Sequence, residues 1–375
     1  MTQAPDPGMT LQRSSRDPDS VRAQLTAWLA TVLPDGADPE VVLHSGVDAN
    51  GMSSETLVLD VVATVGGERT TKEYVARVAP AAEDFPVFEH YDLAGQRRLI
   101  RTVGELTDVP VPAVGELEAT GSVFGTPFFL MERVDGVVPP DVLPYNFGDN
   151  WLFDASPDDQ RRLQDGSVDV LARLHAMATA DLDWLDPVGQ GHDGTTALAR
   201  NLARTRSWYE YAARDIGRSP LVERALAWLG ANLPDTDEAV LCWGDARIGN
   251  IMYRDFAPVA VLDWEMATLG PRQLDVSWMV FAHRVFETIT GLMEMPGMAH
   301  FLREEDVVAA YEARTGVTLG PLEWFHVYNG LQWCIVFMRT GARQIHFGEI
   351  ERPAAVEDLF HCRPLVEAIL DEVGA

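Results

Sequence analysis

The stretch CWGDARIGNIMYRDFAPVAVLDWE, residues 242–265, constrains the fold of this chain more than any other. It contains two short apolar runs that read as buried strands, with the aspartates Asp245 and Asp263 beside them. A carboxylate at the edge of a buried strand is costly to desolvate unless a partner compensates its charge. A divalent cation or a structural salt bridge could be that partner. The fold must therefore place a cation or a positively charged side chain next to both aspartates.

The spacing within this stretch favours the cation. Asn250 follows Asp245 across a loop, and a β-hairpin over the two apolar runs would bring Asn250 next to Asp263. Carboxylate and amide oxygens are the hard ligands that Mg²⁺ prefers, with phosphates and water completing its octahedron. A carboxylate that does not bind the metal could accept a proton from an attacking hydroxyl. Phosphoryl transfer needs little beyond these parts and correct positioning.

Composition narrows the class of protein and its partners. The chain has 375 residues, of which 47% are hydrophobic, so it can bury the core of two lobes. Its net charge of −28 argues against nucleic acid or an anionic membrane as a partner. The three cysteines do not suggest a disulfide framework or a zinc site, and no apolar run is long enough to cross a membrane. We expect a cytoplasmic protein of undetermined oligomeric state.

The order of predicted elements indicates an α+β fold with two lobes. Residues 1–19 are predicted to be a disordered tail, followed by a helix with Ser20 or Asp19 as its N-cap. Strand-like segments then dominate, and helical periodicity dominates later, including one stretch over residues 198–228. We therefore expect a β-rich N-lobe at 20–133 and a mainly helical C-lobe at 134–375.

The motifs of the central stretch resemble those of a known family. WGDARIGN resembles the HGDxxxxN catalytic loop of the aminoglycoside phosphotransferase family, which is related to choline kinases and protein kinases. VLDWE resembles the segment that carries its metal-binding aspartate. The resemblance covers the chain from about residue 25 onward. It is closest to a subgroup that includes actinobacterial phosphotransferases and the kinase-like domain of acyl-CoA dehydrogenase fusion proteins. It implies a protein-kinase-like two-lobed fold, with ATP and Mg²⁺ as cofactors.

The resemblance assigns roles to four residues of the central stretch. Asp245 takes the position of the catalytic base, and Asn250 and Asp263 those of the magnesium ligands. Arg247 stands where protein kinases place a lysine that contacts the transferred phosphoryl group. Each residue taken singly also fits an ordinary structural role, such as a loop cap or a turn. Their order and spacing together favour the functional interpretation.

The N-lobe has matching segments for the nucleotide. HSGVDANGMSSET resembles the loop that covers the phosphates, through Gly51, Ser53 and Ser54, although an ordinary hairpin turn would also fit. Arg77 takes the position of a phosphate-contacting lysine, and arginine can engage two phosphate oxygens at once. Gln96 stands where the family has a glutamate that pairs with that lysine. Its amide oxygen could accept a hydrogen bond from Arg77 but could not pair the charge of Arg77.

The segment MERV resembles the kinase hinge, where the carbonyl of Glu132 and the amide of Val134 would contact adenine. A plain strand end is the alternative. Trp243 replaces the histidine that usually precedes Gly-Asp in the catalytic loop. His175 is predicted to be a hydrogen-bonded core residue, and Asp275 resembles a family aspartate that braces the loop.

These features predict an ATP-dependent phosphotransferase that acts on a hydroxyl of a small molecule. A metabolic hydroxyl such as that of a hydroxyacyl-CoA is favoured over an aminoglycoside. A CoA ester would need basic residues on the helical lobe, for which Arg272, Arg339 and Arg343 are candidates. The alternatives are a nucleotide-binding pseudokinase with a regulatory role and a small-molecule pocket that does not depend on nucleotide.

Overall fold

The computed structural model describes residues 16–44, 54–141, 144–187 and 191–375. The chain divides into two compact units. The first comprises Met1–Pro86 and Val114–Arg133, and the second comprises Val87–Ala113 and Val134–Ala375. One change of unit thus falls between residues 133 and 134, where the sequence analysis placed its boundary, whereas residues 87–113 cluster with the second unit. None of the helices in the described ranges is long and apolar enough to cross a membrane.

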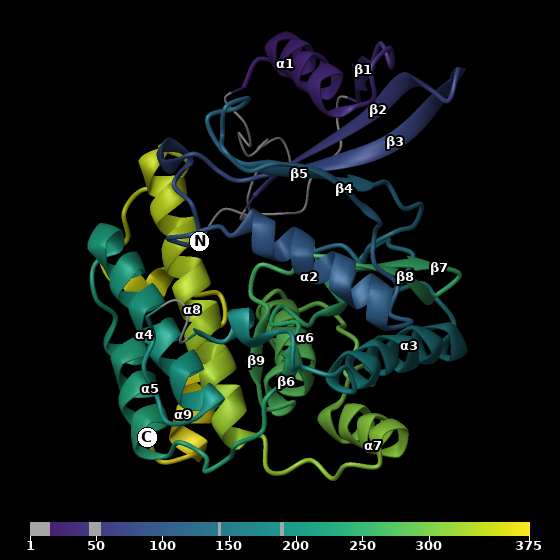
Figure 1. The fold of residues 1–375 in the computed structure, drawn as a ribbon. Coiled ribbons are helices and arrows are strands. Elements are labelled where there is room, and N and C mark those ends of the chain that lie inside the picture. The colour runs from purple at the N-terminus through teal and green to yellow at the C-terminus, as the bar shows by residue number, and fades with distance from the viewer. Residues whose placement is uncertain (1–15, 45–53, 142–143, 188–190) are drawn as a thin grey trace. The chain divides into compact units, whose positions relative to one another are not determined.

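The first unit is one helix packed on an antiparallel sheet (Figure 1). Its elements are α1 (Pro18–Val32), β1 (Glu40–Leu43), β2 (Glu55–Val65), β3 (Glu68–Val78), β4 (Val114–Glu118) and β5 (Phe128–Glu132). The strand order is β1-β2-β3-β5-β4, with every neighbouring pair antiparallel. Gly66 and Gly67 connect β2 to β3 with φ values of 62° and 86°, as a two-residue type I′ turn requires.

Helix α1 begins earlier than the sequence analysis predicted. Asp17, and not Ser20 or Asp19, is its N-cap, because the Asp17 side chain accepts a hydrogen bond from the Ser20 amide at 2.9 Å. Pro18 occupies the first helical position, where its missing N–H leaves nothing unsatisfied. Residues 16–19, which the sequence analysis included in the predicted tail, are part of the first unit, because Arg16 forms an ion pair with Glu55 and the other three residues form the start of α1.

The core of the first unit lies between α1 and the sheet. Val21, Leu25 and Leu29 lie on one helical face and are at most 3% exposed. They belong to one apolar cluster with sheet residues that include Leu59 and Phe128. Side chains alternate between the two faces of the sheet, and the apolar face supplies the other side of this core. The helix and the sheet therefore bury each other's apolar faces.

The second unit is mainly helical (Figure 1). Its helices are α2 (Leu93–Leu106), α3 (Pro157–His175), α4 (Ala197–Ile216), α5 (Pro220–Ala231), α6 (Gln273–Leu292), α7 (Glu304–Thr315), α8 (Glu323–His346) and α9 (Arg363–Glu372). Its strands are β6 (Val240–Cys242), β7 (Ile251–Arg254), β8 (Ala257–Val261) and β9 (Thr268–Gly270). The strands form two antiparallel pairs, β6 with β9 and β7 with β8.

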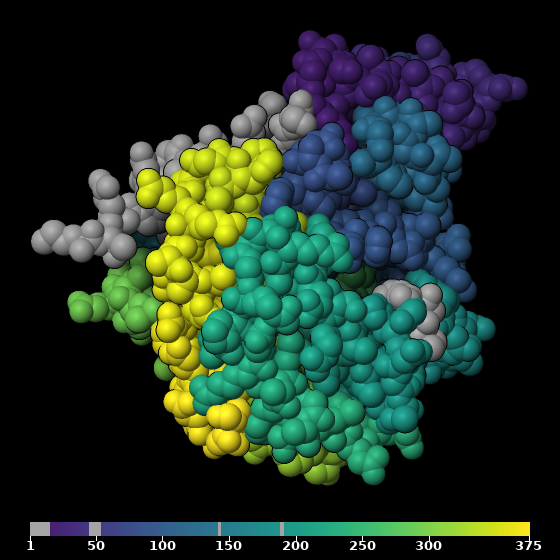
Figure 2. Space-filling model, turned by 90° about the vertical axis from the view of Figure 1, so that its left-hand side faces the viewer, coloured from purple at the N-terminus to yellow at the C-terminus, as the bar shows by residue number. Residues whose placement is uncertain are grey.

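Helix α8 is the central packing element of the second unit. It contacts α4, α5, α6 and α9. In the space-filling view of Figure 2, residues of α4 and α5 (teal) lie against C-terminal residues (yellow) on one face. The predicted helical stretch over residues 198–228 is two helices. Ser219 caps the second of these by accepting from the Val222 amide at 3.3 Å, and Pro220 opens it.

The core between α1 and the sheet generates a stability prediction. Replacing Leu25, which is fully buried, by alanine leaves a cavity, so the free energy of unfolding should fall by about 2–5 kcal/mol. Gln24→Ala, at an exposed position on the same helix, is the control and should change it by less than about 0.5 kcal/mol. Urea denaturation followed by circular dichroism measures both. Equal, small changes in the two variants would contradict the packing.

Candidate active site

The loop between β6 and β7 is held by a buried carboxylate beneath it. Asp275, in the first turn of α6, is fully buried. Its two oxygens accept the backbone N–H groups of Trp243 and Gly244, at 2.7 and 2.8 Å. His175 on α3 lies 3.1 Å from one of these oxygens, and its other ring nitrogen lies 2.7 Å from the Tyr311 hydroxyl. Asp275 and His175 therefore act as the bracing and core residues that the sequence analysis expected.

Two further features determine the path of this loop. Gly244 has φ of +93°, and a Cβ at this position would lie 2.3 Å from the Met266 carbonyl oxygen, so only glycine fits. The Trp243 indole N–H donates to the carbonyls of Leu262 and Asp263, at 2.8 and 3.2 Å. Trp243 thus connects the loop to the segment that carries the second aspartate.

Asp245 receives hydrogen bonds from two sides. The Asn250 amide nitrogen donates to its Oδ2 at 2.6 Å and to its backbone carbonyl at 3.1 Å. The Trp278 indole N–H, on α6, donates to its Oδ1 at 2.8 Å. The carboxylate is therefore fixed in orientation, while part of its surface stays accessible, with 20% of the side chain exposed. A positioned, partly exposed carboxylate can accept a proton from a bound hydroxyl.

Arg247 lies between carboxylates. Its Nε donates to Asp245 at 3.2 Å, and its Nη1 forms an ion pair with Asp141. Burial by itself would lower the pKa of Arg247, yet the net shift is upward, because of the charges of Asp141, Asp245 and Asp263. The guanidinium thus compensates the mutual repulsion of these three acids.

Asp263 lies beside this group through the hairpin of β7 and β8. Ile251 pairs with Val261, and the Leu262 amide donates to the Asn250 carbonyl at 2.9 Å. This pairing places Asn250 next to the segment of Asp263. Asp263 has a left-handed backbone with φ of +56°, a conformation that aspartate and asparagine tolerate better than most residues.

The donor set at this place fits a divalent cation such as Mg²⁺. The Asn250 amide nitrogen faces Asp245, and in the described part of the chain no donor is hydrogen-bonded to its Oδ1. That oxygen and the Asp263 carboxylate are hard ligands from adjacent segments, the type that magnesium uses together with phosphate oxygens. Asn250 and Asp263 are therefore the residues that could hold the metal.

A second group of potential ligands has another explanation. His175, Cys242 and Asp275 are all buried, and their ligand atoms lie within 4.8 Å of one another. The atoms of His175 and Asp275 are already engaged in the hydrogen bonds that hold the loop. Burial, together with the charge of Asp275, raises the pKa of the Cys242 thiol well above its ordinary value. A protonated thiol is a poor ligand and a poor nucleophile.

The residues predicted to contact the nucleotide are distributed over both units. Arg77 lies on β3 with 8% exposure, Ser54 is buried just before β2, and Glu132 is the last residue of β5. Gln96, buried on α2, and Val134 belong to the second unit. Gly51 and Ser53 lie outside the described residues. The structure thus brings together Asp245, Arg247, Asn250 and Asp263 within one unit.

Two residues of this site were missed in the sequence analysis. Asp141 lies 106 positions before Arg247 in a proline-rich segment, and nothing in that segment indicates a partner. Trp278 had a usable signal, because it follows Asp275 at i+3 and therefore shares its helical face. A helix that braces the loop through Asp275 can also reach Asp245 through Trp278.

The bracing carboxylate generates a stability prediction. In Asp275→Asn, only one oxygen remains to accept the two loop amides, so the free energy of unfolding should fall by about 1–3 kcal/mol. Asp181→Asn, the same change at an exposed position, is the control. Chemical denaturation measures both. An Asp275→Asn variant as stable as the control would mean that these hydrogen bonds do not hold the loop.

Comparison with known proteins identifies related chains. "Probable acyl-CoA dehydrogenase IBR3" of Arabidopsis thaliana is 29% identical over 279 residues, which are 68% of this chain and 31% of that protein. Acyl-CoA dehydrogenase family member 11 of Homo sapiens is 29% identical over 259 residues, which are 68% of this chain and 29% of that protein. This chain therefore spans less than a third of the length of these two relatives.

Solved structures share the fold. A "putative aminoglycoside phosphotransferase" from Ralstonia eutropha has a TM-score of 0.65 at 20% identity, covering 94% of this chain and 98% of that one. A thermostable mutant of aminoglycoside phosphotransferase APH(4)-Ia, in complex with ADP and hygromycin B, has a TM-score of 0.54 at 17% identity, covering 90% and 95%. These likenesses confirm the predicted protein-kinase-like α+β fold.

A family profile extends the comparison to most of the chain. The profile described as "Phosphotransferase enzyme family" matches residues 60–320. The matched range includes the catalytic-loop motif, the segment of Asp263 and the bracing Asp275. The predicted membership of a phosphotransferase family is thereby confirmed, and this chain belongs to the phosphotransferase enzyme family.

Proposed function

We propose that this chain transfers the γ-phosphoryl group of ATP to a hydroxyl group of a small metabolite. The observation that carries the proposal is the arrangement around Asp245. Its carboxylate is oriented by Asn250 and Trp278, while part of its surface remains accessible. A carboxylate held in this way beside a candidate magnesium site is what phosphoryl transfer requires.

In the proposed reaction, the acceptor hydroxyl attacks the γ-phosphorus in line with the bond to the leaving ADP. A bond forms between the acceptor oxygen and phosphorus, the bond from phosphorus to the β–γ bridging oxygen breaks, and Asp245 accepts the hydroxyl proton. Asn250 and Asp263 would hold Mg²⁺, which when bound neutralises phosphate charge. Arg247 would add positive charge near the transferred group. Its ion pair with Asp141 also keeps it in place.

For the nucleotide, we assign the residues indicated by the family resemblance. Arg77 would contact the phosphates together with Gly51, Ser53 and Ser54, and Gln96 would support Arg77 by a hydrogen bond. The carbonyl of Glu132 and the amide of Val134 would contact adenine. Support comes from the position of Glu132 at the end of β5, immediately before the change of unit at residues 133 and 134.

For the acceptor, we favour the hydroxyl of a hydroxyacyl-CoA over that of an aminoglycoside. The curated relatives are named as acyl-CoA dehydrogenases, and this chain matches only part of each. A phosphotransferase domain and a dehydrogenase joined in one chain would act on consecutive forms of one substrate class. The solved structures bound to hygromycin B share less sequence with this chain, at 17% identity.

The proposal predicts magnesium-dependent ADP release that an acceptor stimulates. We would assay a panel of hydroxyacyl-CoA esters, a panel of aminoglycosides and a sample without acceptor. In Asp245→Asn, kcat should fall by roughly two to four orders of magnitude, because the proton acceptor is lost. Asp255→Asn makes the same change at an exposed position of the β7–β8 turn and should retain wild-type turnover.

The possible outcomes separate the proposal from its alternatives. Turnover of Asp245→Asn close to that of wild type would show that another group accepts the proton. ATP binding without release in either panel would favour a pseudokinase. The proposed transfer would be refuted if the protein bound acceptors but not ATP, and if magnesium did not change the affinity for acceptors.

The metal assignment predicts a separate effect at Asp263. Asp263→Asn should remove most of the tightening of ATP binding by Mg²⁺, because a neutral amide is a weaker ligand. The expected loss of affinity for Mg-ATP is roughly tenfold or more, since even a residue that only hydrogen-bonds to a metal ligand changes metal affinity by roughly 10- to 100-fold. Isothermal titration with ATP, with and without Mg²⁺, measures it. Affinity in the absence of metal serves as the control and should change little.

A further inference from the structure

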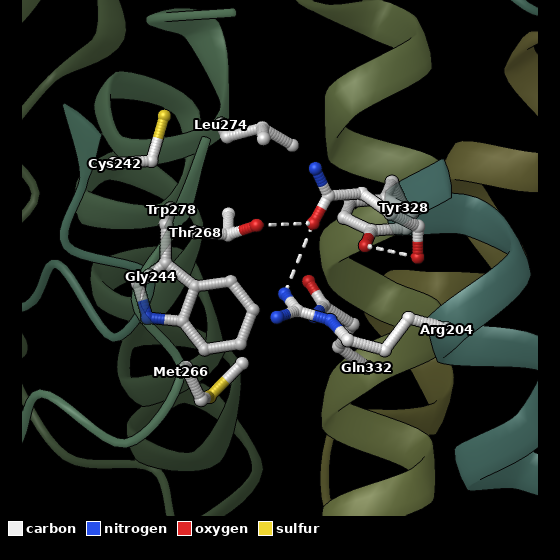
Figure 3. A pocket seen from close by; sticks show the side chains of 10 residues that line it. Arg204, Cys242, Gly244, Met266, Thr268, Leu274, Trp278, Tyr328 and Gln332 are labelled. Atoms are coloured by element: carbon white, nitrogen blue, oxygen red, sulfur yellow. Dashed lines mark hydrogen bonds between the residues drawn. The ribbon is translucent and has the colours of Figure 1, made fainter. Parts of the chain in front are cut away.

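A small cavity lies directly behind the catalytic loop, inside the second unit (Figure 3). Its volume is about 20 Å³, which is room for about one water molecule or the tip of a small group. Residues from five elements line it, among them Arg204 of α4, Cys242 of β6, Thr268 of β9, Trp278 of α6, and Tyr328 and Gln332 of α8. A sugar ring could not enter such a space.

The cavity shares a wall with the proposed proton acceptor. Gly244, which lines it, immediately precedes Asp245 in the chain. Trp278 lines it with its ring and donates its indole N–H to Asp245 Oδ1 at 2.8 Å. A molecule whose hydroxyl lies at Asp245 could therefore place another of its groups in this cavity.

Arg204 is the charged residue among those that line the cavity, and no ion pair within the described residues compensates its charge. Figure 3 shows its side chain extending from α4 toward the indole of Trp278. Of its five N–H donors, one is bonded in the described structure, to Asn201 Oδ1 at 3.0 Å. Among the described residues, no carboxylate forms an ion pair with Arg204. The acid whose charge influences it, Asp186, is bound to Arg200.

Other arginines of this acidic chain differ in this respect. Arg272 forms an ion pair with Glu238, and Arg339 forms one with Asp215, so two of the basic candidates named from the sequence are already paired. Arg247 is bound by two carboxylates. In a chain of net charge −28, an arginine in a cavity without an ion-pair partner needs an explanation.

The electrostatic surroundings agree with a site of positive potential. Burial lowers the pKa of Arg204, but an arginine remains charged under any physiological condition. Burial and the charge of Arg204 together lower the pKa of His192. Gln332 on α8, whose side chain lies beside that of Arg204 (Figure 3), is only 6% exposed. In the part of the chain that the structure describes, no hydrogen bond engages its side-chain amide.

We infer that this cavity binds the acyl oxygen of the acceptor, through Arg204 and Gln332, while the acceptor's hydroxyl lies at Asp245. The inference rests on the proposed function and specifies its substrate class. A guanidinium donates two parallel hydrogen bonds to a carboxylate and strong charge-assisted bonds to a carbonyl oxygen. Both a free hydroxy acid and its CoA thioester carry such an oxygen. Kanamycin, an aminoglycoside, carries no acyl oxygen.

The test uses defined probes and measures binding without nucleotide. The probes are 3- and 4-hydroxybutyrate, their CoA thioesters, 1,4-butanediol as a diol without an acyl oxygen, and kanamycin as a polycation. Isothermal titration is run on wild type, Arg204→Gln and Arg206→Gln. Arg206 is the matched control, because it loses the same charge from an exposed position on α4. ADP release is measured in parallel with saturating Mg-ATP.

We expect wild type and Arg206→Gln to bind an acyl probe, and Arg204→Gln to bind it roughly 10- to 100-fold more weakly, the loss of a charge-assisted hydrogen bond. In turnover, KM for the acceptor should rise by a similar factor while KM for ATP stays constant. Comparison of the acid with its thioester identifies which source of the acyl oxygen is preferred.

Three results would overturn the inference: equal affinity of Arg204→Gln and wild type for the acyl probes, no binding of any acyl probe, or binding of butanediol as tight as that of the acids. Binding that depends on Arg204 but is accompanied by no ADP release would support the acyl-oxygen site and count against the proposed transfer. Failure of the inference and failure of the proposed function therefore give different results.

Discussion

The candidate active site depends on the buried carboxylate of Asp275. It accepts the backbone N–H groups of Trp243 and Gly244, which would otherwise be buried polar groups of an irregular loop. His175 completes its hydrogen bonds. Asp275 is in the first turn of α6, where the helix dipole favours a negative charge. The position of Asp245 therefore follows from a helix, and not from the loop alone.

Two arginines of the second unit differ in whether nearby carboxylates compensate their charge. Arg247 lies among Asp141, Asp245 and Asp263, and its charge allows these acids to lie close together. Arg204 lines a cavity next to the same loop and has no such acid bound to it among the described residues. The charge of Arg247 is compensated by side chains of the protein itself. The charge of Arg204 would be compensated by an oxygen of a bound ligand.

The sequence predicted which segments are helical better than it predicted the residues at which each helix begins and ends. The helical face of Val21, Leu25 and Leu29 is periodic, so α1 could be predicted, but its start depends on the side-chain hydrogen bond of Asp17. The stretch over residues 198–228 is periodic throughout, although Pro220 begins a new helix within it. Periodicity reports which residues face a core, whereas helix ends depend on single capping contacts.

The sequence by itself determined the local part of the site. Asp245, Asn250 and Asp263 are joined by one loop and one hairpin, so their short separations in the chain sufficed to predict that they meet. Only the tertiary structure decided that Asp141, Trp278 and Arg204 join them. Helical periodicity indicated that Trp278 shares a face with Asp275, but not that this face meets the loop. Asp141 and Arg204 come from segments far from the loop in the chain, and no periodic signal connects them with it.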